Sequence, residues 1–537
     1  MVKITKEAAL AYHEGERPGK IEVKPTKPYR TQTDLSLAYS PGVAYPCLEI
    51  QSNPNDAYRY TDKGNLVAVI SNGTAVLGLG DIGAISGKPV MEGKGLLFKI
   101  YGGIDVFDIE LDEKDPEKFC ETVERIAPTF GGINLEDIKA PECFYIEQRL
   151  KKTLDIPVMH DDQHGTAIIS AAGLKNALEV AGKDVKTAKL VINGAGAAAI
   201  SCTNLYMALG IQKENIVMLD SHGVITVDRE DLNPQKAAFA TNRTDIHTLQ
   251  EAIKGADVFV GLSKGKVLTK DMIRSMADRP IVFALANPIP EISYEEAIES
   301  RPDVIMSTGR SDYPNQINNV IGFPYIFRGA LDVHAKAINE EMKMAAVQAI
   351  ADLAKQPIPD VVNEVYHIND LVFGPAYFIP KPIDPRLITE VSVAVAKAAV
   401  KSGVARTPIE DWGTYRESLK QLLGQESKFT RKLHATAVRH PQRVVFAEGE
   451  HPTMMKAAFQ AMQEGMCHPI LLGNPDRVSR LANRLKIDLK GVEIVDMRAD
   501  QEQGRRAAFA KHLAEKCERQ GYTFDEAYDK MYERNYF

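Results

Sequence analysis

One segment, residues 189–220, constrains the fold of this 537-residue chain more than any other. It begins with a short apolar strand pattern, passes through a turn of glycine and alanine that starts at Gly194, and continues as an apolar helix over 197–209. A second apolar run then ends in Asp220, 26 residues after Gly194. A strand, glycine turn, helix, strand and acid in this order are typical of a βαβ unit that binds a pyrophosphate at the helix N-terminus. The segment predicts a Rossmann-type domain for NAD or NADP, and the alternative is a plain α/β crossover with small residues.

The small residues of this turn have distinct physical roles. Gly194 permits the tight turn, and Gly196 lets the backbone approach a pyrophosphate. Ala197 opens the helix, and Ala199 is small enough for the helix to pack closely on the strand. Asp220 can accept a hydrogen bond from a ribose hydroxyl, which favours NAD. These five residues are predicted cofactor-binding positions, and Asn287 is a sixth.

A second glycine pattern, residues 78–83, fits the same spacing. Pro89 follows shortly afterwards, where it is expected to stop a helix, and no second strand with a terminal acid follows at the expected distance. We therefore interpret 78–83 as a close-approach turn that lines a cleft. The apolar runs 66–70 and 75–79 flank an Asn-Gly pair, which predicts a hairpin or a tight strand connection.

The rest of the chain alternates strand-like and helix-like segments, which predicts an α/β fold with a mostly parallel sheet. Strands are expected at 95–100, 106–109, 156–159, 189–192, 216–219, 258–260, 281–286, 304–306 and 443–446, and helices at 5–13, 116–127, 166–181, 330–353 and 387–402. A polar stretch over 424–442 marks a boundary. We expect three α/β regions, over 1–165, 166–424 and 430–537.

Composition excludes several classes of protein. Lys and Arg total 65 against 72 Asp and Glu, a net charge of −7, which argues against sequence-independent nucleic-acid binding. No run of about 18 apolar residues is present to span a membrane, and the N-terminus lacks the apolar core of a signal peptide. The six cysteines form no CxxC pair and are expected to be reduced. We predict a cytoplasmic protein that binds neither nucleic acid nor membrane.

Acidic pairs suggest a metal site. Glu136 and Asp137 are adjacent, and alone they fit a solvated or helix-capping pair. Asp161 and Asp162 follow an expected strand, where α/β sheets bind ligands. Three carboxylates suit Mg²⁺ or Mn²⁺ and leave positions for substrate oxygens and water. Lys94, in an expected glycine-flanked loop, could act as a base if a dry, metal-adjacent cleft lowers its pKa.

Polar residues elsewhere could contact an anionic substrate. Asn287 follows an apolar strand pattern, and Asn318 and Asn319 are adjacent. Their amides are neutral donors, although asparagine is also common in turns. Tyr39 precedes a Ser-Pro-Gly turn and is either an ordinary half-buried aromatic or a functional group.

Taken in order, these motifs resemble the malic enzymes, specifically the bacterial malic enzymes that carry a C-terminal phosphotransacetylase-like domain. The resemblance covers nearly the whole chain. The segments that carry it are 35–44, 77–83, 89–98, 134–138, 160–167, 285–290 and 307–319, with 443–449 and 469–475 opening the phosphotransacetylase-like domain. In such proteins that domain is much longer, so we expect a truncated or naturally shortened member.

The resemblance implies oxidative decarboxylation of L-malate to pyruvate and CO₂ with reduction of NAD(P)⁺. It implies that Lys94 is the general base, that Tyr39 protonates the enolpyruvate carbon, and that Asp161 tunes Lys94. The implied metal ligands are Glu136, Asp137 and Asp162, and the implied malate-orienting residues are Asn287, Asn318 and Asn319, with Asn287 also at the cofactor.

Two positions affect specificity. The larger eukaryotic-type enzymes carry an arginine where this chain has Ala75, so Arg310 and the Asn318–Asn319 pair are candidates to meet the substrate carboxylate. Asp220 favours NAD, but relatives with a similar Asp-Ser segment include NADP users, and His222 lies where a basic residue could meet a 2′-phosphate. On the resemblance we expect NADP rather than NAD.

Two alternatives stay open. One is a metal-free amino-acid or hydroxy-acid dehydrogenase, which independence from Mg²⁺ or Mn²⁺ would reveal. The other is a regulatory nucleotide- or acetyl-CoA-binding module without turnover. The resemblance implies a homodimer or higher homo-oligomer. It implies acetyl-CoA regulation only with a complete C-terminal domain, so we expect no acetyl-CoA response from this chain.

Overall fold

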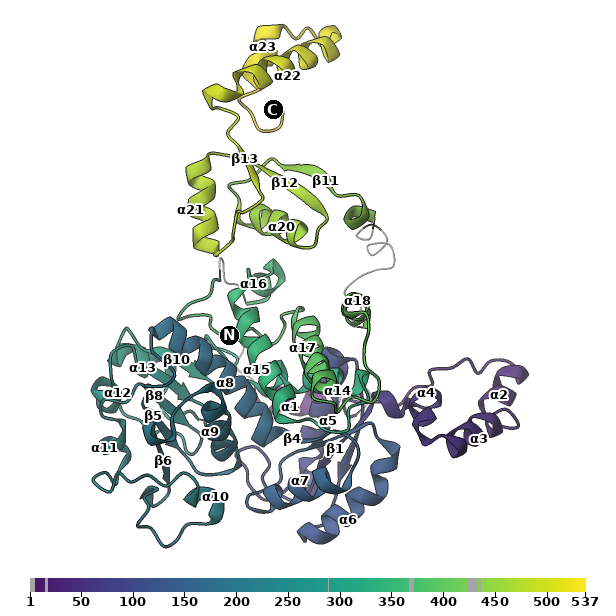
Figure 1. Cartoon of the computed structure of the whole chain (residues 1–537), viewed down its shortest axis with the longest axis vertical. Helices are drawn as coiled ribbons and strands as arrows, with labels where there is room; N and C mark the ends of the chain where they lie inside the picture. The colour runs from purple at the N-terminus through teal and green to yellow at the C-terminus, as the bar shows by residue number, and fades with distance from the viewer. Residues whose placement is uncertain (1–4, 15–17, 288, 367–370, 423–432, 434–435) are drawn as a thin grey trace. The chain divides into compact units, whose positions relative to one another are not determined.

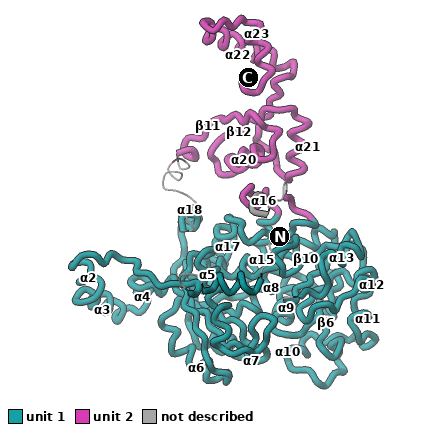
Figure 2. The backbone as a smooth tube through the Cα atoms, turned by 180° about the vertical axis from the view of Figure 1, so that it is seen from behind, with its two compact units in different colours: residues 1–354, 375–423 teal, residues 355–374, 424–537 magenta. Residues whose placement is uncertain are grey.

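The computed structural model describes residues 5–14, 18–287, 289–366, 371–422, 433 and 436–537. They fall into two compact units, which Figure 2 distinguishes by colour. The first unit comprises residues 1–354 and 375–423, and the second comprises 355–374 and 424–537. The sheets are mostly parallel with helices between the strands, which confirms the predicted α/β class.

The first unit begins with a four-stranded parallel sheet in the order β2–β1–β3–β4. Its strands are β1 (Leu66–Ser71), β2 (Asp105–Glu110), β3 (Gly132–Leu135) and β4 (Val158–His160). Every residue of β1 is buried, as expected of a central parallel strand. Helices α6 (Pro116–Ile126) and α7 (Glu142–Thr153) contribute apolar side chains to the same core. The predictions of strands near 106–109 and 156–159 and of a helix at 116–127 are confirmed.

Helix α5 (Ala84–Gly102) corrects three expectations. Pro89 lies inside it on an exposed position, Lys94 belongs to it rather than to a loop, and 95–100 is helical rather than extended. The buried positions of α5 recur every three or four residues and are mostly small: Ala84, Gly87, Met91, Gly95, Phe98 and Gly102. A Cβ on Gly95 would come within 3.3 Å of Val106, so glycine here serves close helix–sheet packing. That packing outweighs the local cost of proline.

The expected hairpin at 66–79 is wrong. Strand β1 pairs in parallel with β2 and β3, and the segment after it forms only an isolated bridge between Val76 and Gly80. Gly73 has a φ of +65°, and a Cβ there would lie 2.2 Å from the Gly83 carbonyl oxygen. The loop therefore folds back on itself, as expected for a close-approach turn, instead of continuing as a strand.

The nucleotide-type sheet has six strands in the order β10–β9–β8–β5–β6–β7. Its strands are β5 (Leu190–Asn193), β6 (Ile216–Asp220), β7 (Gly223–Val224), β8 (Val258–Gly261), β9 (Ile281–Ala284) and β10 (Ile305–Thr308). All pairings are parallel except β6 with β7. The chain runs outward from β5 to β6 on one side and later from β8 to β10 on the other. The switch point, where ligands bind outside the carboxyl ends, therefore lies between β5 and β8.

Helices cover this sheet and join it to the first (Figure 1). The longest is α8 (Asp161–Ala181), which packs against α9 (Ala197–Leu209). The expected helix over 330–353 is instead two helices, α14 (Phe323–Asp332) and α15 (Glu340–Lys355), separated where His334 has a φ of +47°. The other helices of this part are α10 (Pro234–Ala237), α11 (Leu249–Ile253), α12 (Lys270–Ser275), α13 (Tyr294–Ser300), α17 (Leu387–Lys401) and α18 (Trp412–Leu422).

Four short N-terminal helices precede the first sheet: α1 (Lys6–Glu14), α2 (Gln32–Ala38), α3 (Ala44–Ser52) and α4 (Ala57–Tyr60). None of them contains a buried residue. Helices α2, α3 and α4 extend away from the two sheets in both views of the chain (Figures 1 and 2). We call residues 30–60 the arm.

The second unit contains a parallel three-stranded sheet in the order β11–β12–β13. Its elements are α16 (Asp360–Tyr366), β11 (Gln442–Phe446), α20 (Pro452–Gln463), β12 (Cys467–Leu472), α21 (Pro475–Leu485), β13 (Glu493–Val495), α22 (Gln503–Lys516) and α23 (Phe524–Lys530). The strand expected at 443–446 is confirmed as part of β11. Among the helices of the described residues, none has the length and apolar character needed to cross a membrane.

Candidate active site

Two acidic pairs meet at the carboxyl edge of the first sheet. Glu136 and Asp137 follow β3 directly, and Asp161 and Asp162 open α8 directly after β4. Strands β3 and β4 are paired neighbours, with Leu135 opposite His160. The backbone N–H of Asp137 donates a hydrogen bond of 2.8 Å to Asp162 Oδ2, which ties the two pairs together. We call Glu136, Asp137, Asp161 and Asp162 the acid cluster.

The acid cluster has the composition of a divalent metal site. One carboxylate oxygen from each of Glu136, Asp137 and Asp162 lies within 4.8 Å of the others. Burial, followed by the neighbouring carboxylates, raises the pKa of Glu136 to about 8 and the pKa of Asp137 and Asp162 to about 7. Asp137 Oδ2 is buried without a hydrogen-bond partner among the described residues. Clustered, buried carboxylate oxygens are hard ligands and fit Mg²⁺ or Mn²⁺.

Lys94 reaches this cluster from α5. Its Nζ lies 2.7 Å from Asp161 Oδ2 and 2.8 Å from Glu136 Oε1. It also lies 4.4 Å from the centre of the Phe323 ring. Burial alone would lower the pKa of Lys94, but the Asp161 and Glu136 carboxylates outweigh burial and raise it. Lys94, Asp161 and Glu136 are therefore paired with one another as charged side chains.

The three predicted asparagines differ in position. Asn319 joins the acid cluster, because its Nδ2 donates to Asp161 Oδ2 at 3.1 Å and its Oδ1 accepts from Thr166 at 3.1 Å. Asn318 Oδ1 instead accepts from the backbone N–H of Val320. Asn287 is exposed just beyond the carboxyl end of β9. Only Asn319, of these three, has a described contact with the cluster.

Other predicted residues do not converge on the cluster. Tyr39 is 77% exposed at the end of α2, and no hydrogen bond of its hydroxyl is described. The Arg310 guanidinium donates to Asp312 at 2.9 and 2.6 Å and is therefore already paired. Ala75 contributes its backbone N–H, which donates to the Asp137 carbonyl oxygen at 3.0 Å.

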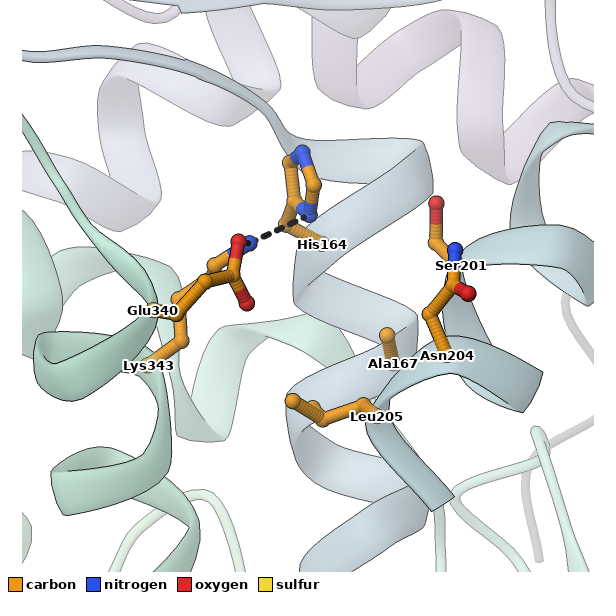
Figure 3. Close-up of a pocket in the computed structure, with 7 residues that line it drawn as sticks. All are labelled: His164, Ala167, Ser201, Asn204, Leu205, Glu340 and Lys343. Carbon is orange, nitrogen blue, oxygen red and sulfur yellow. Dashed lines mark hydrogen bonds and ion pairs between the residues drawn. The ribbon is translucent and has the colours of Figure 1, made fainter. Parts of the chain in front are cut away.

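A buried network behind the cluster escaped the sequence analysis. Glu147 on α7 accepts from the His160 backbone N–H at 3.0 Å and pairs with His164 Nε2 at 2.9 Å. Lys343 Nζ approaches the other ring nitrogen of His164 at 3.3 Å, beside a cavity of about 220 Å³ (Figure 3). This network holds the junction of β4 and α8, from which Asp161 and Asp162 project. The His160–His164 spacing was visible in the sequence, but the partners on α7 and α15 were not.

The dinucleotide turn has the predicted geometry. Gly194 has a φ of +136°, and a Cβ there would lie 2.6 Å from the Leu262 carbonyl oxygen, so glycine is required. Around Gly196, the N-cap of α9, a Cβ would meet no atom within 4 Å, which leaves space in front of the helix N-terminus. Ala197 begins α9, and Ala199 is buried. The free N–H groups of this helix end suit a phosphate.

Asp220 is not a free acceptor. Arg229 donates to both of its carboxylate oxygens, at 2.8 and 3.1 Å, and Lys236 Nζ donates at 2.8 Å. Burial raises the pKa of Asp220, but Arg229 and Lys236 outweigh it and hold the pKa well below its ordinary value. His222 is largely exposed beside Asp220 and Asp231. The carboxyl end of β6 therefore carries two cations that the sequence analysis missed, and they pair with the carboxylate from which that analysis argued for NAD.

Family models match most of the chain. The model "Malic enzyme, N-terminal domain" matches residues 18–151, and "Malic enzyme, NAD binding domain" matches 163–373. The model "Phosphate acetyl/butaryl transferase" matches residues 428–537. The chain belongs to the malic enzymes, in the form that carries a phosphotransacetylase-like region, as the resemblance implied.

Individual relatives support the same family. The NADP-dependent malic enzyme of Escherichia coli K12 is 56% identical over 92% of this chain and 66% of its own length. The NADP-dependent malic enzyme of Halomonas elongata is 60% identical over 76% of this chain and 96% of its own length. The crystal structure of the Pyrococcus horikoshii malic enzyme aligns with a TM-score of 0.71 and 44% identity, covering 78% of this chain and 96% of that one. The matches support an NADP-dependent malate dehydrogenase of the oxaloacetate-decarboxylating type.

Proposed function

We propose that this chain converts L-malate to pyruvate and CO₂, with NADP⁺ as the preferred hydride acceptor and a divalent cation in the acid cluster. The observation that carries the proposal is the contact of Lys94 with Glu136 and Asp161 at the carboxyl edge of the first sheet. Asn319 links this cluster to the part of the chain that carries the dinucleotide turn. A base, an acid cluster and a dinucleotide fold thus occur together in one compact unit.

Glu136, Asp137 and Asp162 are the residues that would hold Mg²⁺ or Mn²⁺. When bound, the cation supplies Lewis acidity that polarises the carbonyl of oxaloacetate for loss of CO₂. Asp137 Oδ2, which is buried and has no hydrogen-bond partner in the described part of the chain, supports this assignment, as do the raised pKa values of the three carboxylates.

Lys94 is the proposed general base. Its neutral amine would take the proton of the malate hydroxyl while the hydride at C2 moves to the nicotinamide ring, which leaves oxaloacetate and NADPH. Asp161 and Glu136 favour the protonated lysine. Compensation of their charge would therefore make the neutral amine more accessible. Asp161, held by Asn319, would keep the amine oriented.

Tyr39 is the proposed general acid. After CO₂ leaves, the enolpyruvate carbon needs a proton, and the phenol hydroxyl of Tyr39 would donate it. Asn319 would orient malate through its amide beside Asp161. Asn287 and Asn318 would also help to orient malate, on the side of the substrate that faces the cofactor.

Arg229 and Lys236 support the preference for NADP. They lie at the carboxyl end of β6, where the adenosine ribose binds in Rossmann-type domains. Their charges would meet a 2′-phosphate, for which guanidinium geometry is well suited. His222 is a third candidate contact.

The test is NADP⁺ reduction with L-malate, in Mn²⁺ and in excess EDTA, with pyruvate measured as product. We expect metal-dependent turnover in the wild type and its loss in Asp137→Asn. Asp108→Asn is the matched control, because Asp108 is also a largely buried carboxylate paired with a lysine, Lys88, but lies outside the acid cluster. Turnover that EDTA does not change would favour the metal-free dehydrogenase. Dinucleotide binding without turnover would favour the regulatory module.

A cytoplasmic location and assembly into a homodimer or higher oligomer accompany this proposal.

A further inference from the structure

A polar cavity lies between three helices of the first unit, and its lining is separate from the acid cluster and from the dinucleotide turn. Its volume is about 220 Å³, and residues of α8, α9 and α15 line it. A water molecule takes up about 30 Å³ in the liquid, so the cavity has room for a small ion. The polar side chains that line it are His164, Ser201, Asn204, Glu340 and Lys343. None of them belongs to the proposed catalytic, metal-binding or dinucleotide-binding residues.

Lys343 brings a buried positive charge to the wall of this cavity. Its side chain is 6% exposed, and its Nζ forms an ion pair with Glu340 at 2.5 Å. The Glu340 side chain is 73% exposed, so water competes for its carboxylate. Burial lowers the pKa of Lys343, and the ion pair with Glu340 offsets that effect only in part. An anion that entered the cavity would therefore stabilise the ammonium group.

His164 orients this ammonium group. Nε2 of His164 lies 2.9 Å from Glu147 Oε2, and because a carboxylate only accepts, Nε2 carries the hydrogen. Burial lowers the pKa of His164, so the ring is neutral and its Nδ1 accepts from Lys343 Nζ at 3.3 Å. An ammonium group donates three hydrogen bonds. After those to His164 and Glu340, one N–H of the Lys343 ammonium has no acceptor among the described residues.

Two polar side chains of α9 face Lys343 across the cavity. Figure 3 shows Ser201 and Asn204 on the opposite side from Lys343 and Glu340. Ser201 is only 8% exposed, and neither its hydroxyl nor the Asn204 amide has a hydrogen-bond partner in the described part of the chain. Polar groups in such a position are normally hydrogen-bonded. A hydroxyl, an amide and an ammonium group around one cavity are a set of donors that suits an oxyanion.

We infer that this cavity binds a small oxyanion, a carboxylate or a phosphate, with Lys343 as the charged contact and Ser201 and Asn204 as neutral donors. The Glu340 carboxylate pairs with Lys343 until the oxyanion takes its place. Displacement costs little, because the exposed Glu340 carboxylate returns to water. The inference does not depend on the proposed activity, because no residue of the acid cluster takes part in it.

The test is equilibrium dialysis of the full chain against radiolabelled inorganic phosphate or radiolabelled acetate at constant ionic strength. EDTA removes divalent cations that would bind phosphate, and saturating NADP⁺ occupies the dinucleotide turn, where a phosphate would also bind. We expect binding that NADP⁺ does not displace. Binding of phosphate alone would identify a phosphate-bearing ligand, binding of acetate alone a carboxylate, and binding of both an oxyanion of either kind. Binding of neither would overturn the inference.

Two substitutions should change this binding in opposite directions. Lys343→Met removes the charge but keeps an unbranched side chain, and it should weaken oxyanion binding by about 10-fold or more, the value of one hydrogen bond to a charged group. Glu340→Gln removes the competing carboxylate, and it should strengthen binding by up to about fivefold. Changes in the same direction, or unchanged binding in both variants, would overturn the inference.

Lys530→Met is the matched control, because Lys530 also pairs with a glutamate three residues away, Glu533 at 3.1 Å, but lies on α23 in the second unit. It should leave oxyanion binding unchanged, and a loss equal to that of Lys343→Met would overturn the inference. Thermal unfolding shows whether Lys343→Met is folded. If it is not, Asn204→Ala should still weaken binding by about 2–10-fold through the lost amide. Unchanged binding in both Asn204→Ala and Glu340→Gln would then overturn the inference.

Discussion

Arg229→Ala should shift dinucleotide preference from NADP towards NAD. Arg229 holds Asp220 through hydrogen bonds of 2.8 and 3.1 Å, and its side chain is only 15% exposed. A hydrogen bond to a charged group contributes about 1.5–3 kcal/mol, which is about one to two factors of ten in affinity. Removal of Arg229 deletes that contact with a 2′-phosphate and leaves Asp220 as an acceptor for a 2′-hydroxyl. We expect the KM for NADP⁺ to rise about 10–100-fold, with little change for NAD⁺.

Steady-state kinetics with each dinucleotide at saturating L-malate and Mn²⁺ test this prediction. Arg243→Ala is the matched control, because Arg243 forms a similar two-point pair, with Asp245 rather than with Asp220. The control should leave the ratio of kcat/KM for NADP⁺ over NAD⁺ unchanged, whereas Arg229→Ala should lower it. An equal loss with both dinucleotides, or no loss with either, would refute the assignment of Arg229 to the 2′-phosphate.

Two other predictions concern stability. Mn²⁺ at 100 times its Kd should stabilise the wild type by about 2.7 kcal/mol in thermal unfolding, and Asp137→Asn should lose that gain; equal shifts in both proteins would contradict the metal site. Burial raises the pKa of Glu291 to about 7 from 4.5, so the folded chain keeps a proton that the unfolded chain releases. The contribution of Glu291 to the free energy of unfolding should therefore fall as pH rises from about 4.5 to 7, by about 3 kcal/mol at 1.36 kcal/mol per pKa unit. Glu291→Gln should remove that contribution, so the pH profile of the variant should be shallower than that of the wild type by this amount, and parallel pH profiles of the two proteins would contradict the reasoning.

Local patterns predicted the nucleotide-type domain well. The expected helix over 197–209 matches α9 at both ends, because small residues open it and Gly210, with a φ of +116°, ends it. The structure also contains the strands predicted at 216–219 and 258–260. They were predictable because buried parallel strands have continuous apolar sequences. In these segments the residues that determine the structure are neighbours in sequence.

Prediction failed where distant contacts decide the local structure. Glycines in residues 84–102 suggested a loop, but their helical spacing lets α5 pack against β2. The runs 66–70 and 75–79 suggested a hairpin, but β1 finds its partners far along the chain, in β2 and β3. Neither outcome depends on the residues next to the segment.

The residues of the candidate active site also divide into those that the local sequence predicts and those that required the structure. Glu136, Asp137, Asp161 and Asp162 were predictable, because acids at the carboxyl ends of parallel strands gather at one edge. The contacts of Lys94 needed the structure, and so did the pairing of Asp220 with cations from the following loop. The exposed position of Tyr39 outside the cluster also could not be read from its motif, because the burial of a side chain depends on contacts with residues far from the motif.

The most direct test of the central claim is NADP⁺ reduction by Lys94→Ala with L-malate and Mn²⁺, compared with Lys88→Ala. Both lysines belong to α5 and pair with carboxylates, but the partners of Lys88 lie outside the acid cluster: Glu92, Asp108 and Glu110. We predict that Lys94→Ala binds NADP⁺ normally and loses at least about 100-fold in kcat, while Lys88→Ala stays close to wild type. Wild-type turnover in Lys94→Ala would contradict the assignment of Lys94 as the base.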